Sequence, residues 1–413
     1  MGLRAVRVPA GINRIDVSTS HDQFSLLGIG RNVLDLGIFG PAGHALATPR
    51  VSWLVGRCAG GLHDVGRQRD ARLPCRPIEQ GRWAMALGPV VINPLGMDWQ
   101  ANVVLTEGVQ PSLRYVPTVR ASAQRGWQAG WYRGDLHTHT VHSDGRRRIE
   151  EMAEAAKSTG LDFIVSTDHN TSSANRAWGS STSTELEVIA GEEVTTRHGH
   201  WLTVGLPPDG WVDYAARVRA DGGRVVAAHP SVPLPGCAWE FGYHDVDAME
   251  VWNGLWNVDD ELSLRIWHQL LRQGRRIVAV GGSDSHVSEQ PVGRPQTVVY
   301  AEEPSTAGLI DGLRHGRCYV AESSGVTLAF NASRDRDTVA VTAEVRGAHD
   351  TTISLITDTG CVGRAKTDAD GAGSLACTAP RGAARFARVE VRRRSRFPSM
   401  LALSNPVWLD ALA

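Results

Sequence analysis

Histidine and acidic side chains are concentrated in a few short segments between residues 134 and 286. The densest segment, GDLHTHTVHSDG (134–145), contains His137, His139, His142 and Asp144. Later segments are TDHN (167–170), GEEVTTRHGHW (191–201), AAHP (227–230) and GGSDSH (281–286). Imidazoles and carboxylates that converge on one face are ligands for divalent metal ions, which lower the pKa of bound water. The sequence therefore predicts a metal-dependent hydrolase.

Spacing within these segments indicates which side chains share a site. His137 and His139 are two residues apart, and on a strand such residues point to the same face, so both rings can reach one ion. Asp144 follows in a turn and can approach a second ion. In TDHN, His169 is the preferred ligand, and Asp168 is expected to orient a neighbouring group.

Glu192 and Glu193 are adjacent, so only one of them can face the site from a strand, where it could bridge two ions. Two surface carboxylates are the alternative, which the flanking apolar residues VIAG and VTT disfavour. Of the next two histidines, His200 opens a strand and is a better ligand than His198. The candidate ligands are His137, His139, Asp144, His169, one of the two glutamates, His200, His229, Asp284 and His286. One ion takes three or four protein ligands, so this set implies two or three ions.

Apolar runs precede the polar segments, as in IVSTDH, VIAGEE, VVAAHP and IVAVGGSD. Across residues 129–323 such runs alternate with helical patterns, which favours an α/β fold with a parallel sheet, either open or closed into a barrel. In barrels the chemistry lies at the carboxyl ends of the strands, so the segments are expected to meet there.

Three helices are expected from the 3.6-residue period of apolar positions. Residues 146–160 place Ile149, Met152, Ala153 and Ala156 on one face. Residues 258–274 begin at an Asp cap and place Leu262, Ile266 and Leu270 in register. Residues 304–316 place Leu309 and Leu313 in register.

The flanking regions have strand patterning without a sustained helical period. Residues 1–128 contain short apolar runs separated by Gly, Pro or Asn clusters, which is typical of a β-sandwich. Residues 324–413 return to alternating runs such as TVAVTAEV and predict a small β domain. We therefore expect three domains, 1–128, 129–323 and 324–413.

Bulk composition excludes several classes. The net charge of −1 gives no global attraction to nucleic acid, and no apolar stretch is long enough to span a bilayer. The six cysteines form no CxxC pair, and the N-terminal residues show no signal peptide, so a reduced, cytoplasmic protein is expected. The oligomeric state is not indicated.

The motifs HTH and SDG (137–145), TDHN, GEE, HP (229–230) and SDSH (283–286), in this order, resemble the PHP (polymerase and histidinol phosphatase) superfamily of metal-dependent phosphoesterases. This resemblance implies a distorted (β/α)7 barrel with up to three ions and assigns the bridging role to Glu193. It implies one site of His137, His139, Glu193 and Asp284. It implies a second metal site formed by Glu193, His200 and His229, and a third metal site formed by Asp144, His169 and His286.

Further segments are similar to the CehA/McbA group of carbaryl hydrolase-like proteins. They are EEVTTRHGHW, EVWNG (250–254), VGRPQTVV (292–299), LDLGIFGPAG (34–43), GRWAMALGP (81–89) and ALSNPVWL (402–409). Some members of this group cleave carbamate or ester bonds, so the resemblance does not carry over a substrate.

These observations predict a hydrolase with two or three divalent ions (Zn, Mn or Fe), in which a metal-bound hydroxide attacks a phosphoester of a small, anionic substrate. Arg146, Arg197 and Arg294 are candidates for binding the anion, although each could equally be a surface residue. His198 or His142 could protonate the leaving group, and Arg294 is also a candidate catalytic residue.

Two alternatives remain. A carbamate or aryl-ester hydrolase would use the same ions with an apolar pocket. The candidates for lining that pocket are Trp178, Trp239, Trp252 and Trp256. Trp252 and Trp256 are equally candidates for the core. A protein that binds a polymer through its β domains, with a decayed barrel, is the non-enzyme alternative, which the complete ligand set disfavours.

Overall fold

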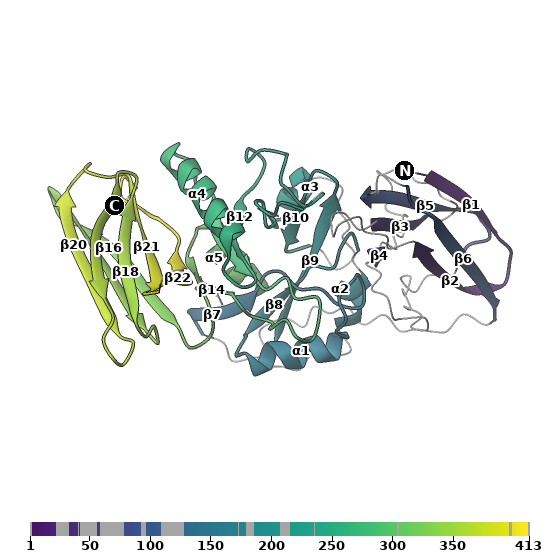
Figure 1. Ribbon diagram of the computed structural model, residues 1–413, viewed down its shortest axis with the longest axis horizontal. Coiled ribbons are helices and arrows are strands. Elements are labelled where there is room, and N and C mark those ends of the chain that lie inside the picture. Colours follow the sequence, from purple (N-terminus) through teal and green to yellow (C-terminus); the bar gives the residue numbers. More distant parts are fainter. Residues whose placement is uncertain are drawn as a thin grey trace.

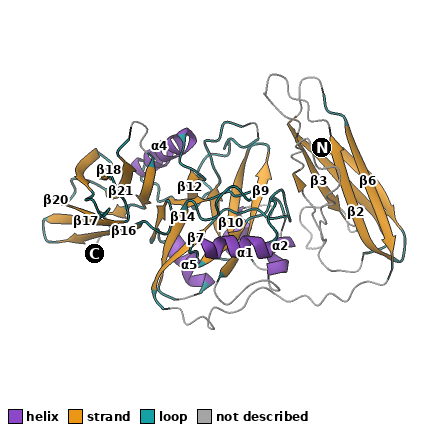
Figure 2. Ribbon diagram, turned by 60° about the horizontal axis from the view of Figure 1, so that its bottom comes forward, coloured by secondary structure: helices purple, strands orange, loops and turns teal. Residues whose placement is uncertain are grey.

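The computed structural model describes residues 2–21, 33–39, 41, 56–57, 78–91, 96–108, 128–171, 173–178, 186–206, 215–234, 236–303, 305–395 and 399–411. Figure 1 shows the N-terminal strands at one end of the long axis, the C-terminal strands at the other and a mixed α/β region between them. The helices are confined to that middle region, as Figure 2 shows. No helix within the described ranges is both long and apolar enough to cross a membrane.

The N-terminal region forms two separate antiparallel sheets. One sheet has the order β1-β5-β3-β4 and the other pairs β2 with β6. Val8, Ile12, Ile15 and Trp83 form a buried apolar cluster that includes residues of both sheets. The strands are β1 (Gly2–Val8), β2 (Ile12–His21), β3 (Val33–Phe39), β4 (Gly56–Arg57), β5 (Gly81–Val91) and β6 (Trp99–Glu107).

The middle region alternates strands with a small number of helices. Its strands are β7 (Gly130–Asp135), β8 (Phe163–Ser166), β9 (Glu187–Thr196), β10 (Gly199–Val204), β11 (Arg224–Ala227), β12 (Ala248–Asn253), β13 (Val278–Gly282), β14 (Gln296–Ala301) and β15 (Cys318–Ala321). Its helices are α1 (Ile149–Ser158), α2 (Ser173–Ala177), α3 (Ala215–Ala220), α4 (Val258–Arg272) and α5 (Thr306–Arg314).

The central sheet is mixed, whereas the alternating pattern predicted a parallel one. Its order is β13-β12-β11-β10-β9-β8-β7-β14-β15. The pairs β7–β8, β8–β9, β11–β12 and β12–β13 are parallel. Strand β10 is antiparallel to both neighbours. Only Arg197 and His198 connect it to β9, and so short a connection can only form a hairpin.

The first and last strands of the run β7–β13 come together just beyond their carboxyl ends. The backbone amide of Asp284 donates to His137 O at 2.9 Å, and that of His139 donates to Ser285 O at 3.3 Å. Thr138 and Ser285 form a parallel bridge. The segments after β7 and β13 therefore lie side by side.

Two of the three predicted helix faces are confirmed. In α1, Ile149, Met152, Ala153 and Ala156 are buried, and in α5, Leu309 and Leu313 are buried. The face predicted for α4 is only partly correct, because Ile266 and Leu270 pack against the core but Leu262 is 43% exposed. The fully buried positions are Leu264, Trp267 and Leu271. The large Trp267 ring packs into the core and turns the helix away from the Leu262 register. The cap of α4 is Asn257 rather than an Asp, and Asp260 completes its capping box.

The C-terminal strands extend the central sheet. Strand β15 pairs with β22, which continues through β21 and β18 to β19, while β16, β17 and β20 form a separate sheet. Both contribute to one apolar cluster with Leu328, Val341, Ile353 and Val389. The strands are β16 (Thr327–Arg334), β17 (Thr338–Arg346), β18 (Thr351–Thr357), β19 (Gly360–Lys366), β20 (Gly373–Pro380), β21 (Phe386–Arg393), β22 (Met400–Ser404) and β23 (Val407–Trp408).

Asn405 attaches the end of β22 to the site-bearing strand β13. Its side chain accepts a hydrogen bond from Ala279 N at 2.7 Å and donates to Ala279 O at 2.9 Å and Cys318 O at 3.1 Å. The residue is 5% exposed, so water cannot readily replace these partners.

We predict that Asn405→Ala lowers the free energy of unfolding by about 3 kcal/mol, because it leaves buried backbone groups without partners. Urea unfolding followed by circular dichroism measures this loss. Asn331→Ala, at an exposed position of β16, is the control and should change stability by less than about 0.5 kcal/mol. Equal effects of the two substitutions would contradict the role of Asn405.

Candidate metal centre

The nine predicted ligands are brought together at one end of the central strands. Each follows, ends or begins a strand there, and eight of the nine have side chains that are less than one-quarter exposed. The exception is His286, which is 27% exposed. The ligands are His137 and His139 (after β7), Asp144, His169 (after β8), Glu193 (in β9), His200 (in β10), His229 (after β11), Asp284 and His286 (after β13).

Glu193 lies at the centre of this cluster and is 1% exposed. Its Oε2 is 3.2 Å from Nε2 of both His137 and His139. Its Oε1 is 2.8 Å from His200 Nδ1 and 3.1 Å from His229 Nε2. The alternation of side chains along β9 therefore directs Glu193 into the cluster. Glu192 is also fully buried, so neither glutamate is a surface carboxylate.

Asp284 and Asp144 place two more carboxylates beside the same rings. Asp284 Oδ1 is 3.0 Å from His139 Nε2 and 3.3 Å from His137 Nε2. Asp144 Oδ1 is 3.2 Å from His286 Nε2 and 3.6 Å from His169 Nε2. The His139 ring stacks against both of these rings, with its centroid 4.4 Å from that of His169 and 4.1 Å from that of His286.

Several buried polar atoms of the cluster have no hydrogen-bond partner, although they lie close to one another. Such atoms are unfavourable unless another group satisfies them, and a divalent cation would do so. They are His137 Nε2, His139 Nε2, Asp144 Oδ1, His169 Nε2, Glu193 Oε2, His200 Nε2, His229 Nδ1 and Asp284 Oδ1. The donor set therefore fits metal ions.

Within the described residues, four groups have one potential ligand atom from each residue within 4.8 Å of the others. The groups are His139–Asp144–His169–His286, His137–His229–Asp284, His137–His139–Glu193 and His169–Glu193–His200. Together they contain all nine predicted ligands.

The electrostatics of the cluster favour added positive charge. Burial raises the pKa of Glu193, but the histidines around it lower that pKa well below its usual value. Burial lowers the pKa of His139, but the adjacent carboxylates of Asp284 and Glu193 raise it to about 10. Burial dominates at His200 and lowers its pKa to about 4. The carboxylates are thus ionised and hold protons on some of the rings.

The backbone is unusual at three points around the cluster. His229 and Asp284 have φ of +26° and +49°, a region that non-glycine residues seldom adopt and that concentrates at functional sites. At Gly282, a Cβ atom would lie 2.5 Å from His137 Cβ, so only glycine lets β13 approach the first ligand this closely.

Three buried side chains that orient the ligands were not predicted from the sequence. Glu250 accepts from His137 Nδ1 at 3.1 Å and from His229 N at 2.8 Å, which leaves His137 Nε2 for a metal. Asp135 accepts from the amides of His137 and Ser283 at 3.1 and 2.9 Å. Arg147 donates to Ser285 Oγ at 2.6 Å and so supports the segment before His286.

Glu250 had a recognisable signal in the sequence, because it is the only charged residue in the apolar strand AMEVWN.

Asp168 was expected to orient a neighbour, and it accepts from Thr140 N, Thr140 Oγ1 and Ser143 Oγ at 2.8, 2.8 and 2.7 Å. It therefore holds the segment that follows His139.

The other predicted site residues lie outside the four groups. His198, 43% exposed, is paired with Glu240 at 2.6 Å and accepts from Arg197 at 2.7 Å. Arg146 and Arg294 are exposed, and His142 is half-buried. Trp252, a candidate both for substrate binding and for the core, is 1% exposed and packs in the core, with its Nε1 donating to Gly254 O at 2.9 Å. Trp178 is likewise fully buried.

Residues 135–238 match the family model of the PHP domain, so the chain contains a PHP domain. The DNA polymerase/3'-5' exonuclease PolX of Bacillus subtilis (strain 168) is 32% identical over 116 residues, which are 26% of this chain and 20% of that protein. The chain thus spans about one-fifth of the length of this curated relative.

Three solved structures share a weak overall similarity with the chain. A two-domain protein with a predicted PHP-like metal-dependent phosphoesterase, from Bacteroides vulgatus, has a TM-score of 0.42 and 17% identity over 68% of this chain and 96% of that one. An amidohydrolase from Chromobacterium violaceum has a TM-score of 0.31 and 16% identity, and the match covers 39% of this chain and 89% of that one. A protein named as a metal-dependent phosphoesterase, from Bifidobacterium adolescentis, has a TM-score of 0.30 and 19% identity, and the match covers 39% of this chain and 90% of that one.

We predict that Glu250→Gln weakens metal binding about 10- to 100-fold, because a neutral amide holds the His137 ring less firmly than a carboxylate. Competition against a fluorescent chelator measures the affinity. Glu344→Gln, on an exposed position of β17, is the control and should leave affinity unchanged. An unchanged affinity in Glu250→Gln would show that this carboxylate does not position the ligand.

Metal affinity should rise with pH across neutrality. Carboxylates raise the pKa values of His137, His139 and His229 against the effect of burial, so these rings carry protons that a metal must displace. The apparent Kd should fall about tenfold per pH unit for each displaced proton between about pH 6 and about pH 8. Calorimetry in buffers of different ionisation enthalpy would detect the released protons. A pH-independent Kd would contradict the raised pKa values.

Proposed function

We propose that this chain is a metal-dependent hydrolase that acts on phosphoester bonds through its PHP domain. The observation that carries the proposal is the buried cluster around Glu193, whose ligand atoms lack hydrogen-bond partners. A stably folded protein retains such atoms only where another group satisfies them, and nine converging His, Asp and Glu side chains favour divalent cations.

Two or three ions (Zn, Mn or Fe) would be held by the sets that the sequence predicts, with Glu193 shared between two of them. When bound, such ions acidify water and polarise the scissile bond. The chain's own residues fix the ligands, since Glu250 orients His137 while Asp168 and Arg147 hold the segments that carry His139 and His286.

We also propose that β7 to β13 close into a distorted seven-stranded barrel within residues 129–323, flanked by β domains at 1–128 and 324–413. The hydrogen bonds between the segments after β7 and β13 support closure at the end that carries the cluster. Closure explains how motifs far apart in the sequence share one site.

An anionic substrate would be bound by arginines near this end. The backbone amide of Arg146 donates to His286 O at 2.7 Å, so its exposed side chain begins beside the cluster. Arg197 and Arg294 are also exposed, and a guanidinium can bind phosphate through two hydrogen bonds. His198, whose Nδ1 pairs with Glu240, and His142 are candidates for protonating the leaving group.

A carbamate or aryl-ester hydrolase of the CehA/McbA type is the second candidate, and one observation favours it. Large apolar side chains are exposed on the segments after β11 and β12, namely Leu234 (60%), Phe241 (53%), Leu255 (69%) and Val258 (73%). His229 and Glu250 come from the same two strands, so an apolar leaving group would find contacts near the cluster.

The test is metal content together with turnover after reconstitution with Mn, Fe or Zn. We expect at least about two ions per chain and hydrolysis of p-nitrophenyl phosphate or its bis-ester. Turnover of 1-naphthyl methylcarbamate alone would favour the second candidate. An inactive protein with less than about one ion per chain would refute both and support the polymer-binding alternative.

Glu193→Gln should lower metal content by about one ion per chain and turnover by at least about 100-fold, since a neutral amide cannot bridge two cations. Elemental analysis and the phosphatase assay measure the two effects. Glu192→Gln is the matched control, because its side chain points to the other face of β9 and the same chemical change should leave both values near wild type. If metal content is unchanged in Glu193→Gln, Glu193 is not a bridge.

Arg294→Ala should reduce phosphoester turnover about 10- to 100-fold and carbamate turnover much less, if its guanidinium binds the phosphoryl oxygens. The comparison of kcat/KM for the two substrate classes measures this selectivity. Equal losses would remove Arg294 from anion binding.

A further inference from the structure

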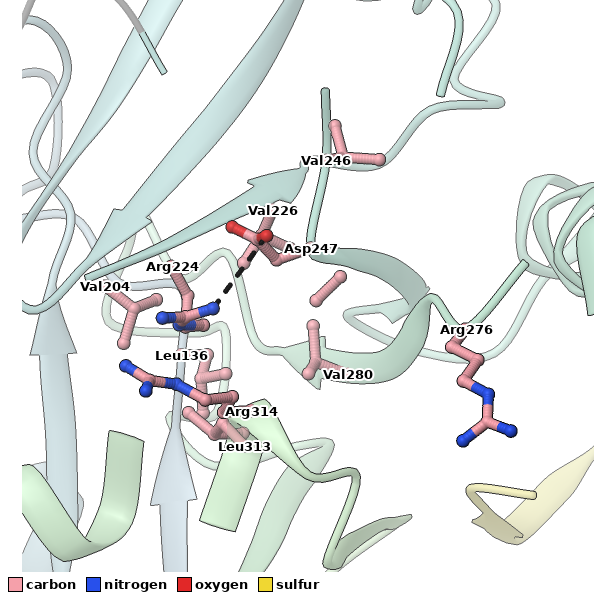
Figure 3. A pocket seen from close by; sticks show the side chains of 11 residues that line it. Leu136, Val204, Arg224, Val226, Val246, Asp247, Arg276, Val280, Leu313 and Arg314 are labelled. Carbon is pink, nitrogen blue, oxygen red and sulfur yellow. Dashed lines mark ion pairs between the residues drawn. The ribbon is translucent and has the colours of Figure 1, made fainter. Parts of the chain in front are cut away.

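A second cavity lies at the opposite end of the central strands. Its volume is about 150 Å³, and Figure 3 shows the side chains that line it. It is bordered by Val204 at the end of the antiparallel β10, by Arg224 at the start of β11 and by Asp247 just before β12. His229 and Glu250 lie further along β11 and β12, towards the metal centre, so the cavity is a separate site.

One part of the cavity wall is apolar, and charged side chains form the rest. Leu136, Val204, Val226, Val280 and Leu313 line the apolar part, and all five belong to one buried apolar cluster of the central sheet. A cavity of about 150 Å³ has room for a ring the size of benzene. The cavity therefore suits a small molecule that has both an apolar part and a polar or charged part.

Two arginines beside this apolar space have weak partners. Arg224 Nη2 and Arg314 Nη2 both donate to Gly222 O at 3.4 Å, and buried Arg224 Nε has no hydrogen-bond partner. Figure 3 shows the two guanidinium groups on the same side of the cavity, with Arg276 apart from them. An unpartnered buried donor is unfavourable and is satisfied by an acceptor that enters the cavity.

The nearest carboxylate does not neutralise both arginines. Asp247 Oδ1 is 3.9 Å from Arg224 Nη1, and the same carboxylate accepts from Arg219 Nε at 3.0 and 3.2 Å and from Val225 N at 2.9 Å. Asp311 also acts electrostatically on Arg224, but it is paired with Arg317 Nη2 at 2.6 Å, and Arg314 is exposed. Positive charge remains in excess next to an apolar space.

We propose that this cavity binds a small carboxylate with an apolar body, of the aromatic or branched-chain acid class. The carboxylate accepts from Arg224 Nε and from the Arg314 guanidinium, while the body contacts Leu136, Val226 and Val280. Guanidinium groups match carboxylates in geometry, and the apolar walls disfavour a fully hydrated anion such as inorganic phosphate. This site is independent of the proposed hydrolase activity.

Benzoate is the probe, titrated calorimetrically into the full chain. Wild-type protein should bind benzoate at least about tenfold more tightly than neutral benzyl alcohol or inorganic phosphate, because only benzoate satisfies both the charge and the apolar walls. Arg314→Gln should weaken benzoate binding about tenfold or more. Arg314 is exposed, so this variant should fold normally, and Arg265→Gln, exposed on α4, is the matched control.

Benzoate could also coordinate metal ions, so the titration is repeated after chelation and after metal reconstitution. The proposal expects the same affinity in both preparations and the same effect of Arg314→Gln. Absence of saturable binding to wild type, equal affinity in Arg314→Gln and Arg265→Gln, or loss of binding on chelation would each overturn it.

Discussion

The burial of the Glu193 carboxylate among five histidines is the constraint on which the rest of the site depends. A charge removed from water must be compensated by opposite charge and by hydrogen bonds. The rings of His137, His139, His200 and His229 supply part of this compensation at 2.8–3.2 Å, and the unsatisfied atoms define where cations would supply the remainder. The ligands are therefore a single electrostatic unit rather than nine separate residues.

This unit determines several features of the surrounding fold. The segments after β7 and β13 must meet because His137 and His139 share Glu193 with ligands from other strands. Gly282 permits the required approach, and Asp135 joins the two strand ends through backbone amides. Glu250 lies behind the ligands. It accepts a hydrogen bond from the His137 ring and another from the backbone amide of His229, and so fixes the positions of both residues.

The ligands could be predicted from the sequence because they lie near the ends of apolar runs. The run indicates where a strand ends, and the two-residue period of the strand indicates which side chains share a face. This period could not choose between Glu192 and Glu193 by itself, since adjacent residues in a strand differ only in the face they occupy. Glu250 and Arg147 were missed because their partners are distant in the sequence. The α4 register was only partly correct because the Trp267 ring, rather than the leucine spacing, decides which face is buried. The direction of β10 depended on a two-residue connection that composition alone does not reveal.

The alternation of side chains after β7 has a consequence for communication within the molecule. Leu136, just after β7, lines the cavity, and the next residue, His137, belongs to the metal cluster. Adjacent side chains along an extended backbone point in opposite directions, so one peptide unit separates the two environments. The backbone at this point therefore has to satisfy two environments at once, so a change in side-chain volume at Leu136 would also displace the His137 ring.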